Sequence, residues 1–542
     1  MNITGRGAVA TSQPLATEAA AEVLREGGSA VDAAISANAM LCLVEPTGAG
    51  IGGDLFVQVW NPGSRRLEGW NASGRSSLTA SLEEMRLRAG GGRLPAHGAL
   101  TVTVPGCVEG WARLHDRYGR LPWRRLLEPA IEAARRGFEL TPVIAGEWAR
   151  NLEVLSAFPS ALALFAPPGF RPEPGARFRN PRLSDDLEEI AREGARAFYQ
   201  GRIARAVAEV VTEGGGFLTI EDLAHHRSEE CAPLSVRSRG IEVSQLPPNG
   251  QGLALLEMWL LLDGRSFRKS GFGSAETLHA CIEAKKLAYE DRARWIADMD
   301  FVELPLDALL DPSLQRARAE GIDPAKAAAT VEPTLPLPNE AEAAPPGEEP
   351  GDTVYLCTAD SDGMLVSWIQ SNFRGMGSGL VPTGCGFMLQ NRGGLFDLHP
   401  GRPNSLAPGK RPFHTIMPGF ACKDGRPWLC FGVMGGDFQP QGQLQILLDL
   451  CEFGMDPREA GRAPRWRHEG SSTPTGERAA GPGRVLLEPG FADSTLEGLR
   501  ARGHAIEVRE GGYGGYQAIL VTEEGAYVAA GEPRKDGTAL AF

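Results

Sequence analysis

The sequence lacks the features that place a chain in or across a membrane. None of its 542 residues belongs to an apolar run of about 18 or more, the length that a helix needs to span a bilayer. The N-terminus, MNITGRGAVATSQPLATEAA, has no basic segment followed by an apolar one, so no secretory signal is visible. We therefore expect a cytoplasmic protein with no membrane partner.

Motifs for metals and nucleotides are also missing. The nine cysteines include no C-x-x-C pair, which suits reduced thiols better than a zinc or disulfide framework. There is no H-E-x-x-H motif and no P-loop, and the glycine-rich GAGIGG stretch precedes a strand instead of opening a helix. The net charge of −13 argues against a nucleic-acid partner, which needs a basic surface. We expect no cofactor and no metal.

An acidic, proline-rich segment interrupts an otherwise globular composition. Residues 331–350, VEPTLPLPNEAEAAPPGEEP, contain six Pro and five Glu but no Lys or Arg. This composition predicts a solvated, extended linker. Before it, residues 126–136, 183–212 and 275–297 show helical periodicity, and Ser29 followed by Asp32 predicts the start of another helix.

Two β-rich stretches follow the linker, Thr353–Asp360 and Met364–Ser371, joined by Ser-Asp-Gly. A short loop with Asp-Gly between such stretches predicts a β-hairpin. Pairing Asp360 with Met364 brings Ser371 opposite Thr353, with Cβ atoms about 5 Å apart. A bulge would change this register, and an ordinary Thr–Ser pair on a sheet explains the pattern equally well.

The abrupt junction between linker and strand indicates proteolysis between Asp352 and Thr353. A cut there gives Thr353 a free α-amine, a base with an ordinary pKa of roughly 8. This amine can accept the hydroxyl proton of Thr353 while the oxygen attacks an amide carbon. No separate histidine is then required, which suits a sequence without a convincing triad motif.

Nine blocks between residues 27 and 443, in the order that the family has them, make the sequence similar to the γ-glutamyltranspeptidase family. They are GGSAVDAAISANAMLCLVEPTGAGIGGDLFVQVW (27–60), VPGCVEGW (104–111), YGRLPW (118–123), FYQGRIA (198–204), LPPNGQG (246–252), EAKKLAYEDR (283–292), GDTVYLCTADSDG (351–363), PGKRPFHTIMP (408–418) and GVMGGDFQPQGQ (432–443). The resemblance implies an α+β fold, a four-layer αββα sandwich of the N-terminal-nucleophile hydrolase type. It also implies autocleavage into a large subunit, 1–352, and a small subunit, 353–542, that stay together as one composite domain.

The resemblance assigns roles to single residues. Thr353 occupies the nucleophile position, and Ser371 replaces a second Thr that hydrogen-bonds the nucleophile and helps processing, which a Ser hydroxyl can do equally well. Gly435 and Gly436 match a Gly-Gly pair whose backbone supports an oxyanion hole. Arg75 matches an Arg that grips the α-carboxylate of the γ-glutamyl group, a task suited to its planar fork.

Other positions depart from the family pattern. His414 and Thr415 stand where two Ser bind the same carboxylate, so His414 either holds an anion when protonated or is a packed imidazole. The family's acceptor-side Asn falls on Phe373, with Asn372 adjacent. The short segment between Leu395 and His414 implies a site without a lid.

The position that pairs with the γ-glutamyl amine is also changed. Leu395 stands where the family has an acidic residue, and Arg392 stands where a Gln is usual. A Leu cannot pair with an ammonium group, and a nearby Arg repels it. Asp397 offers a carboxylate, but two residues out of register.

These departures leave the substrate open. The sequence favours a γ-glutamyltransferase or glutathione hydrolase-like enzyme that cleaves γ-glutamyl or glutaryl-type amides through an acyl-Thr353 ester, with water or an amine as acceptor. One alternative is a glutaryl or cephalosporin acylase-like amidase. An alternative of another class is an uncleaved binding homologue, which would have lost Thr353, Ser371 or the Gly pair. The resemblance also allows a dimer of heterodimers.

Overall fold

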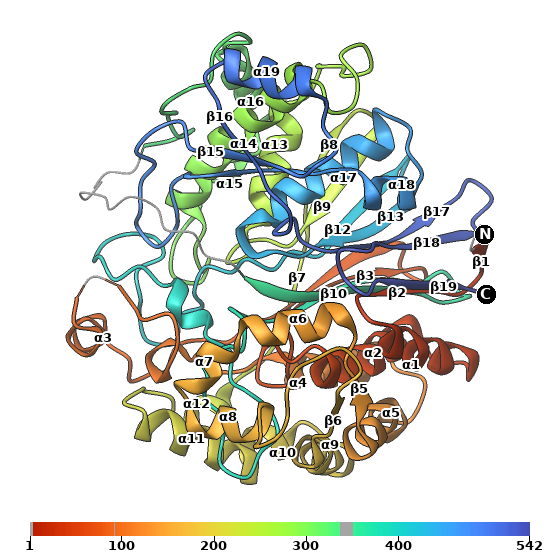
Figure 1. Cartoon of the computed structure of the whole chain (residues 1–542), viewed down its shortest axis with the longest axis vertical. Coiled ribbons are helices and arrows are strands. Elements are labelled where there is room, and N and C mark those ends of the chain that lie inside the picture. The colour runs from red at the N-terminus through yellow and green to blue at the C-terminus, as the bar shows by residue number, and fades with distance from the viewer. Residues whose placement is uncertain (1–3, 92, 337–350) are drawn as a thin grey trace.

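The computed structural model describes residues 4–91, 93–336 and 351–542. Two seven-stranded sheets form its middle layers, and helices cover the outer face of each sheet (Figure 1). An apolar cluster between the sheets and two larger clusters beneath the helices make up most of the core. The αββα sandwich expected from the resemblance is confirmed.

The first sheet contains the predicted hairpin at its centre. In spatial order its strands are β19 (Thr538–Ala541), β2 (Ala8–Thr11), β10 (Asp352–Ala359), β11 (Leu365–Phe373), β3 (Asp54–Asn61), β4 (Arg66–Ala72) and β7 (Glu229–Cys231). The second sheet consists of β1 (Thr4–Gly5), β18 (Tyr527–Gly531), β17 (Tyr516–Val521), β13 (Arg426–Val433), β12 (Gly419–Lys423), β9 (Ile241–Gln245) and β8 (Leu234–Ser238). Smaller sheets pair β14 (Trp466–Glu469), β15 (Arg484–Leu487) and β16 (Ala505–Val508), and β5 (Phe138–Glu139) with β6 (Arg177–Phe178).

Strand β10 is buried on both faces, because helices cover one face of its sheet and the second sheet covers the other. Tyr355 and Cys357 point into the cluster between the sheets, whereas Val354 and Leu356 join the cluster beneath the helices. Successive side chains of a strand point to opposite faces, so a strand in this position buries its side chains on both faces. The apolar run Val354–Cys357 therefore follows from the place of β10 in the sandwich.

Helices on the side of the first sheet come mostly from the first half of the chain. They are α1 (Pro14–Arg25), α2 (Ala30–Val44), α4 (Cys107–Tyr118), α5 (Trp123–Arg136), α6 (Pro142–Arg150), α7 (Leu152–Ser156), α8 (Pro159–Phe165), α9 (Pro181–Glu193), α10 (Arg196–Gln200), α11 (Arg202–Glu213) and α12 (Ile220–His225). The second sheet is covered by α13 (Gly252–Leu261), α14 (Ala275–Trp295), α16 (Pro312–Glu320), α17 (Gln439–Cys451), α18 (Pro457–Arg462) and α19 (Asp493–Ala501). The short elements α3 (Leu82–Ala89), α15 (Leu306–Leu309), η1 (Ala99–Thr101), η2 (Arg392–Leu395) and η3 (Gly436–Phe438) lie in connecting segments.

The predicted helices are present, but one of them is divided. The helix expected over 275–297 is α14, and the one expected over 126–136 is the main part of α5. The range 183–212 instead contains α9, α10 and α11, because Gly194 ends α9 in a left-handed conformation (φ 71°) and Gly201 precedes α11. Of the predicted linker, 331–336 forms no helix or strand, and the Thr334 hydroxyl donates to Asp291 of α14. Residues 337–350 lie outside the described residues.

Helix α2 begins at the predicted cap. Ser29 and Asp32 form a capping box in which each side chain accepts the backbone N–H of the other residue. Asp32 Oδ2 also accepts the backbone N–H groups of Arg120 and Leu121, at 2.8 and 3.1 Å. This fully buried carboxylate therefore fixes both α2 and the loop before α5. Among the described residues, no helix is both long enough and apolar enough to cross a membrane.

We predict that Asp32→Ala lowers the free energy of unfolding by about 3 kcal/mol, because it leaves buried backbone donors without an acceptor. The measurement is the midpoint of thermal unfolding, with Asp116→Ala, an exposed carboxylate on α4, as the matched control. Equal midpoints for the two variants would contradict this role of Asp32.

Candidate active site

Thr353 lies near the start of β10, at an irregularity in the predicted hairpin. The register runs as predicted from Val354–Gln370 to Ala359–Leu365, and it shifts between Asp352 and Val354. Thr353 Oγ1 nevertheless donates a hydrogen bond to Ser371 Oγ at 3.3 Å. The predicted meeting of Thr353 and Ser371 is therefore present, with both side chains buried.

The hydroxyl of Ser371 connects the hydroxyl of Thr353 to the peptide bond that precedes it. Ser371 Oγ donates to the carbonyl oxygen of Asp352 at 2.8 Å, and it accepts the backbone N–H of Phe373 at 2.8 Å. Phe373 has a φ of 77°, which is uncommon for a side chain of this size. The strand end is thus turned so that an N–H orients Ser371, and Ser371 polarises the carbonyl beside Thr353.

The glycine-rich 48–53 stretch packs against this hairpin. A Cβ atom on Gly48 would lie 2.9 Å from Thr353 N, and one on Gly53 would lie 2.7 Å from Ser371 O. Both distances are shorter than real side chains tolerate, so the backbone can approach only where glycine stands. This close packing accounts for the motif without any nucleotide.

Gly435 and Gly436 lie where β13 leads through η3 into α17. Their φ angles of 116° and 58° explain why glycine occupies both positions. A Cβ atom on Gly351 would lie 2.9 Å from Gly436 Cα, so the pair abuts the segment that precedes Thr353. Gln251 donates to the carbonyls of Gly436 and Thr415, which fixes the two segments relative to each other.

A buried cation lies beside the hairpin. Arg392 donates through Nη1 to Thr415 Oγ1 at 2.8 Å, and its guanidinium carbon lies 4.4 Å from the centre of the Phe373 ring. Leu395 packs with Phe373 and Phe413 in a small apolar cluster. Arg392 and Leu395 therefore place positive charge and apolar surface beside the hairpin.

Asp397 does not supply the carboxylate that the family pattern requires at Leu395. It is buried, and its two oxygens accept hydrogen bonds from Arg402 and from His399. These partners belong to the same short loop. Asp397 therefore stabilises the loop between Leu395 and His414.

His414 is a packed, neutral imidazole. It is fully buried, its Nδ1 accepts the N–H of Ile416, and its Nε2 donates to Asp54 Oδ2 at 3.1 Å. Burial and the nearby Arg392 hold the pKa of His414 well below its usual value. Burial raises the pKa of Asp54 to about 7. Of the two interpretations of His414, the structure favours the packed one.

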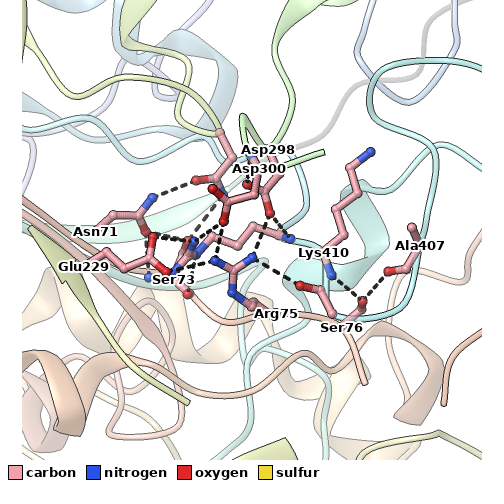
Figure 2. Close-up of polar contacts among 12 residues, drawn as sticks. Asn71, Ser73, Arg75, Ser76, Glu229, Asp298, Asp300, Ala407 and Lys410 are labelled. Carbon is pink, nitrogen blue, oxygen red and sulfur yellow. Dashed lines mark hydrogen bonds and ion pairs between the residues drawn. The ribbon is translucent and has the colours of Figure 1, made fainter. Parts of the chain in front are cut away.

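Arg75 belongs to a charge cluster at the edge of the first sheet (Figure 2). Its guanidinium pairs with Glu229 at 2.9 Å, Asp298 at 3.1 Å and Asp300 at 2.7 Å. Arg411 also binds Glu229. Three carboxylates therefore already surround the charge that the resemblance assigns to a substrate carboxylate.

Asn372 is buried and follows Ser371 on β11. Its backbone N–H donates to Gly48 O at 2.9 Å. Its side-chain amide has no hydrogen-bond partner within the described part of the chain. Asn372 is therefore placed near Thr353 with unused donors and an unused acceptor.

One cluster among the described residues has the composition of a metal site. His279, Glu283 and His504 bring their ligand atoms within 4.8 Å of one another. The Lys286 ammonium donates to Glu283 Oε1 at 2.7 Å. His279 Nδ1 and His504 Nε2 lie 2.8 Å apart, at hydrogen-bond distance. Because a cation already neutralises the carboxylate, we assign no metal there, and the absence of a metal stays a prediction.

Several residues around Thr353 escaped sequence analysis. Asp54 and Gln251 lie inside the recognised blocks 27–60 and 246–252, so a signal for them existed. Lys535 lies in the turn before β19, outside all of the recognised blocks, and its Nζ lies 3.6 Å from Asp352 Oδ1. No local pattern predicts that contact.

A family model described as Gamma-glutamyltranspeptidase matches residues 16–542. The chain belongs to the γ-glutamyltranspeptidase family. It is an enzyme of the hydrolase and transferase kind found in that family, with the fold of an N-terminal-nucleophile hydrolase.

Three relatives cover almost the whole of this γ-glutamyltranspeptidase family member. The glutathione hydrolase-like YwrD proenzyme of Bacillus subtilis (strain 168) is 36% identical over 531 residues, 97% of this chain and 96% of the relative. The oxamate amidohydrolase proenzyme of Klebsiella pneumoniae subsp. pneumoniae is 33% identical and covers 100% of this chain and 99% of its own length. The crystal structure of cephalosporin acylase from Bacillus halodurans has a TM-score of 0.90 and 37% identity, covering 100% of this chain and 96% of that one.

We predict that Ser371→Ala slows self-cleavage of this γ-glutamyltranspeptidase family member about 100-fold, because the Asp352 carbonyl loses the hydroxyl that donates to it. Ser371→Thr keeps the hydroxyl and is expected to cleave at close to the unaltered rate. The measurement is the decay of the full-length band on a denaturing gel after rapid purification. Equal rates for the Ala and Thr variants would contradict the role of the hydroxyl.

Proposed function

We propose that the chain cuts itself between Asp352 and Thr353 and then uses Thr353 to hydrolyse or transfer the acyl group of small amides. The observation that carries this proposal is the bonding of Ser371 Oγ to both the Thr353 hydroxyl and the Asp352 carbonyl. An uncleaved binding homologue would have no need of this arrangement. The two products, 1–352 and 353–542, are the large and small subunits.

Self-cleavage proceeds as a shift of the acyl group from nitrogen to oxygen. Thr353 Oγ attacks the carbonyl carbon of Asp352, whose oxygen is stabilised by the Ser371 hydroxyl. The C–N bond breaks as the hydroxyl proton passes to the leaving nitrogen, which leaves an ester on Thr353 and a free α-amine. Water then hydrolyses the ester to the Asp352 carboxylate and regenerates the Thr353 hydroxyl.

The mature site repeats this chemistry on a substrate. The α-amine of Thr353 accepts the hydroxyl proton as Oγ attacks the substrate carbonyl. The backbone at Gly435 and Gly436 supports the oxyanion hole, and removing one donor of such a hole costs about 3 kcal/mol. The amine leaves with the proton, and water or a second amine takes the acyl group from Thr353.

We predict that Thr353→Ala remains one chain and is inactive, because it removes the attacking oxygen of both reactions. A denaturing gel of the purified protein should show a single band, whereas the unaltered protein yields two. Mass determination of the smaller band should place its first residue at Thr353. Cleavage of the Ala variant, or a cut at another position, would overturn the assignment.

The residues beside Thr353 favour substrates whose acyl group carries a carboxylate but no α-amine. Arg392 supplies a buried cation, and Leu395 supplies apolar surface where an ammonium group would need a carboxylate. Glutaryl and oxalyl amides have this chemistry. The similarity to a cephalosporin acylase and to an oxamate amidohydrolase agrees with it.

The alternative is a γ-glutamyl donor, which the similarity to a glutathione hydrolase-like proenzyme favours. In that case Arg75 binds the α-carboxylate after release from its carboxylate partners, and Asn372 contributes to the same pocket. Thr415 contacts the carboxylate in either case. The cytoplasmic location and the dimer of heterodimers stay predictions from the sequence.

We predict that the enzyme turns over glutaryl-p-nitroanilide faster than γ-glutamyl-p-nitroanilide. Arg392→Met should lower kcat/KM for the glutaryl anilide at least about tenfold and leave a neutral pentanoyl anilide little changed, because one charge–carboxylate pair is lost. Leu395→Asp should shift preference toward the γ-glutamyl anilide, with Leu395→Asn as the uncharged control. Equal effects of Arg392→Met on both acyl groups would contradict the assignment of Arg392.

A further inference from the structure

A buried group of charges adjoins the peptide bond before Thr353. Lys535 lies in the turn between β18 and β19, and its Nζ forms an ion pair with Glu147 of α6. The same Nζ lies 3.6 Å from Asp352 Oδ1. Asp352 Oδ1 in turn accepts the backbone N–H of Thr353 at 3.0 Å. A lysine far away in sequence is thus two contacts from the nitrogen that leaves in self-cleavage.

The environment keeps Lys535 charged. Burial alone would lower its pKa, but the carboxylates of Glu147 and Asp352 raise the pKa above its ordinary value. Glu45 is fully buried, burial raises its pKa to about 8, and its backbone carbonyl accepts the N–H of Gly48. The cluster therefore extends to Gly48, on which an added Cβ would lie only 2.9 Å from Thr353 N.

The aliphatic part of the Lys535 side chain is also packed against its surroundings. A Cβ atom on Gly515 would lie 2.6 Å from Lys535 Cγ, so the backbone just before β17 packs directly on the Lys535 side chain. Only about a tenth of the Lys535 side chain is exposed. The ammonium therefore has a fixed position and needs no ordering before it acts.

We propose that Lys535 is a positioning residue for self-cleavage: it holds the Asp352 carboxylate and thereby orients the peptide bond that Thr353 attacks. The inference rests on the proposed cut before Thr353. Only two rotatable bonds separate the Asp352 carboxylate from its Cα, and Oδ1 also accepts the Thr353 N–H, so holding the carboxylate restricts the orientation of the peptide bond whose carbonyl Ser371 polarises. Thr353 and Ser371 act on the bond directly, whereas Lys535 acts through Asp352.

The pair with Glu147 offers a second explanation, in which Lys535 merely ties the C-terminal turn to α6. Two variants separate the explanations. Lys535→Met keeps the packed stem and removes the charge from both carboxylates. Glu147→Gln keeps an acceptor for Lys535 and leaves the contact with Asp352 in place.

The experiment follows the rate of self-cleavage of freshly purified full-length chain on a denaturing gel, together with the thermal midpoint of each variant. We expect Lys535→Met to slow cleavage about 10- to 100-fold, since small misplacement of reacting groups has effects of that size. Lys535→Arg should restore most of the rate, and Glu147→Gln should change it less than about threefold. Lys423→Met, a lysine at the exposed end of β12, should leave the rate unchanged.

Two results would overturn the inference. One is cleavage of Lys535→Met at the unaltered rate. The other is equal slowing by Lys535→Met and Glu147→Gln with equal loss of thermal stability, which would make Lys535 a structural tie alone. If Thr353→Ala is still cut, the proposed function fails; if Thr353→Ala stays whole while the Lys535 variants cleave normally, only this inference fails.

Discussion

The geometry around Thr353 depends on the hydrogen bonds of one hydroxyl group. Ser371 Oγ accepts from the Thr353 hydroxyl and from the Phe373 N–H, and it donates to the Asp352 carbonyl. A hydroxyl has one donor and two acceptor sites, so all three are used. Rotation of the Ser371 side chain would break at least one of these bonds. The attacking oxygen and the carbonyl beside it are therefore held by the same small group.

The surrounding fold serves to keep that hydroxyl in place. The hairpin of β10 and β11 lies at the centre of a sheet that is covered on both faces. Gly48 and Gly53 let the preceding loop press on Thr353 and Ser371. The left-handed backbone of Phe373 supplies the N–H. Packing, backbone conformation and hydrogen bonding thus converge on the end of one strand pair.

Sequence reasoning succeeded where the determining interactions are local. The hairpin register follows from the lengths of two strands and their loop, and the α2 cap follows from Ser29 and Asp32. The division of 183–212 depends on the backbone of Gly194, which a window-based periodicity ignores. The family resemblance provided the sandwich and the assignments of Gly435 and Gly436, which periodicity alone does not give.

The contacts that could not be predicted join segments distant in sequence. His414 with Asp54, and Lys535 with Asp352, meet only because two sheets and their loops are packed together. Arg75 illustrates the converse. The resemblance assigned it a role, but its three acidic partners come from other segments, and they change what its charge is available for. Electrostatic environment is a property of the packed fold and not of a motif.

The order of strands has a consequence for what a cut at Thr353 produces. In the first sheet, β19, β10 and β11 come from the part of the chain after the cut, whereas β2, β3, β4 and β7 come from the part before it. Because β2 lies between β19 and β10, strands of the two parts are interleaved across the sheet. The carbonyl of Phe542 also accepts the N–H groups of Arg6 and Gly7, which places both chain ends together (Figure 1). Pulling the two pieces apart would strip hydrogen-bonded neighbours from both. Neither fragment would have a complete sheet of its own, so we expect dissociation and unfolding of the two pieces to be a single event.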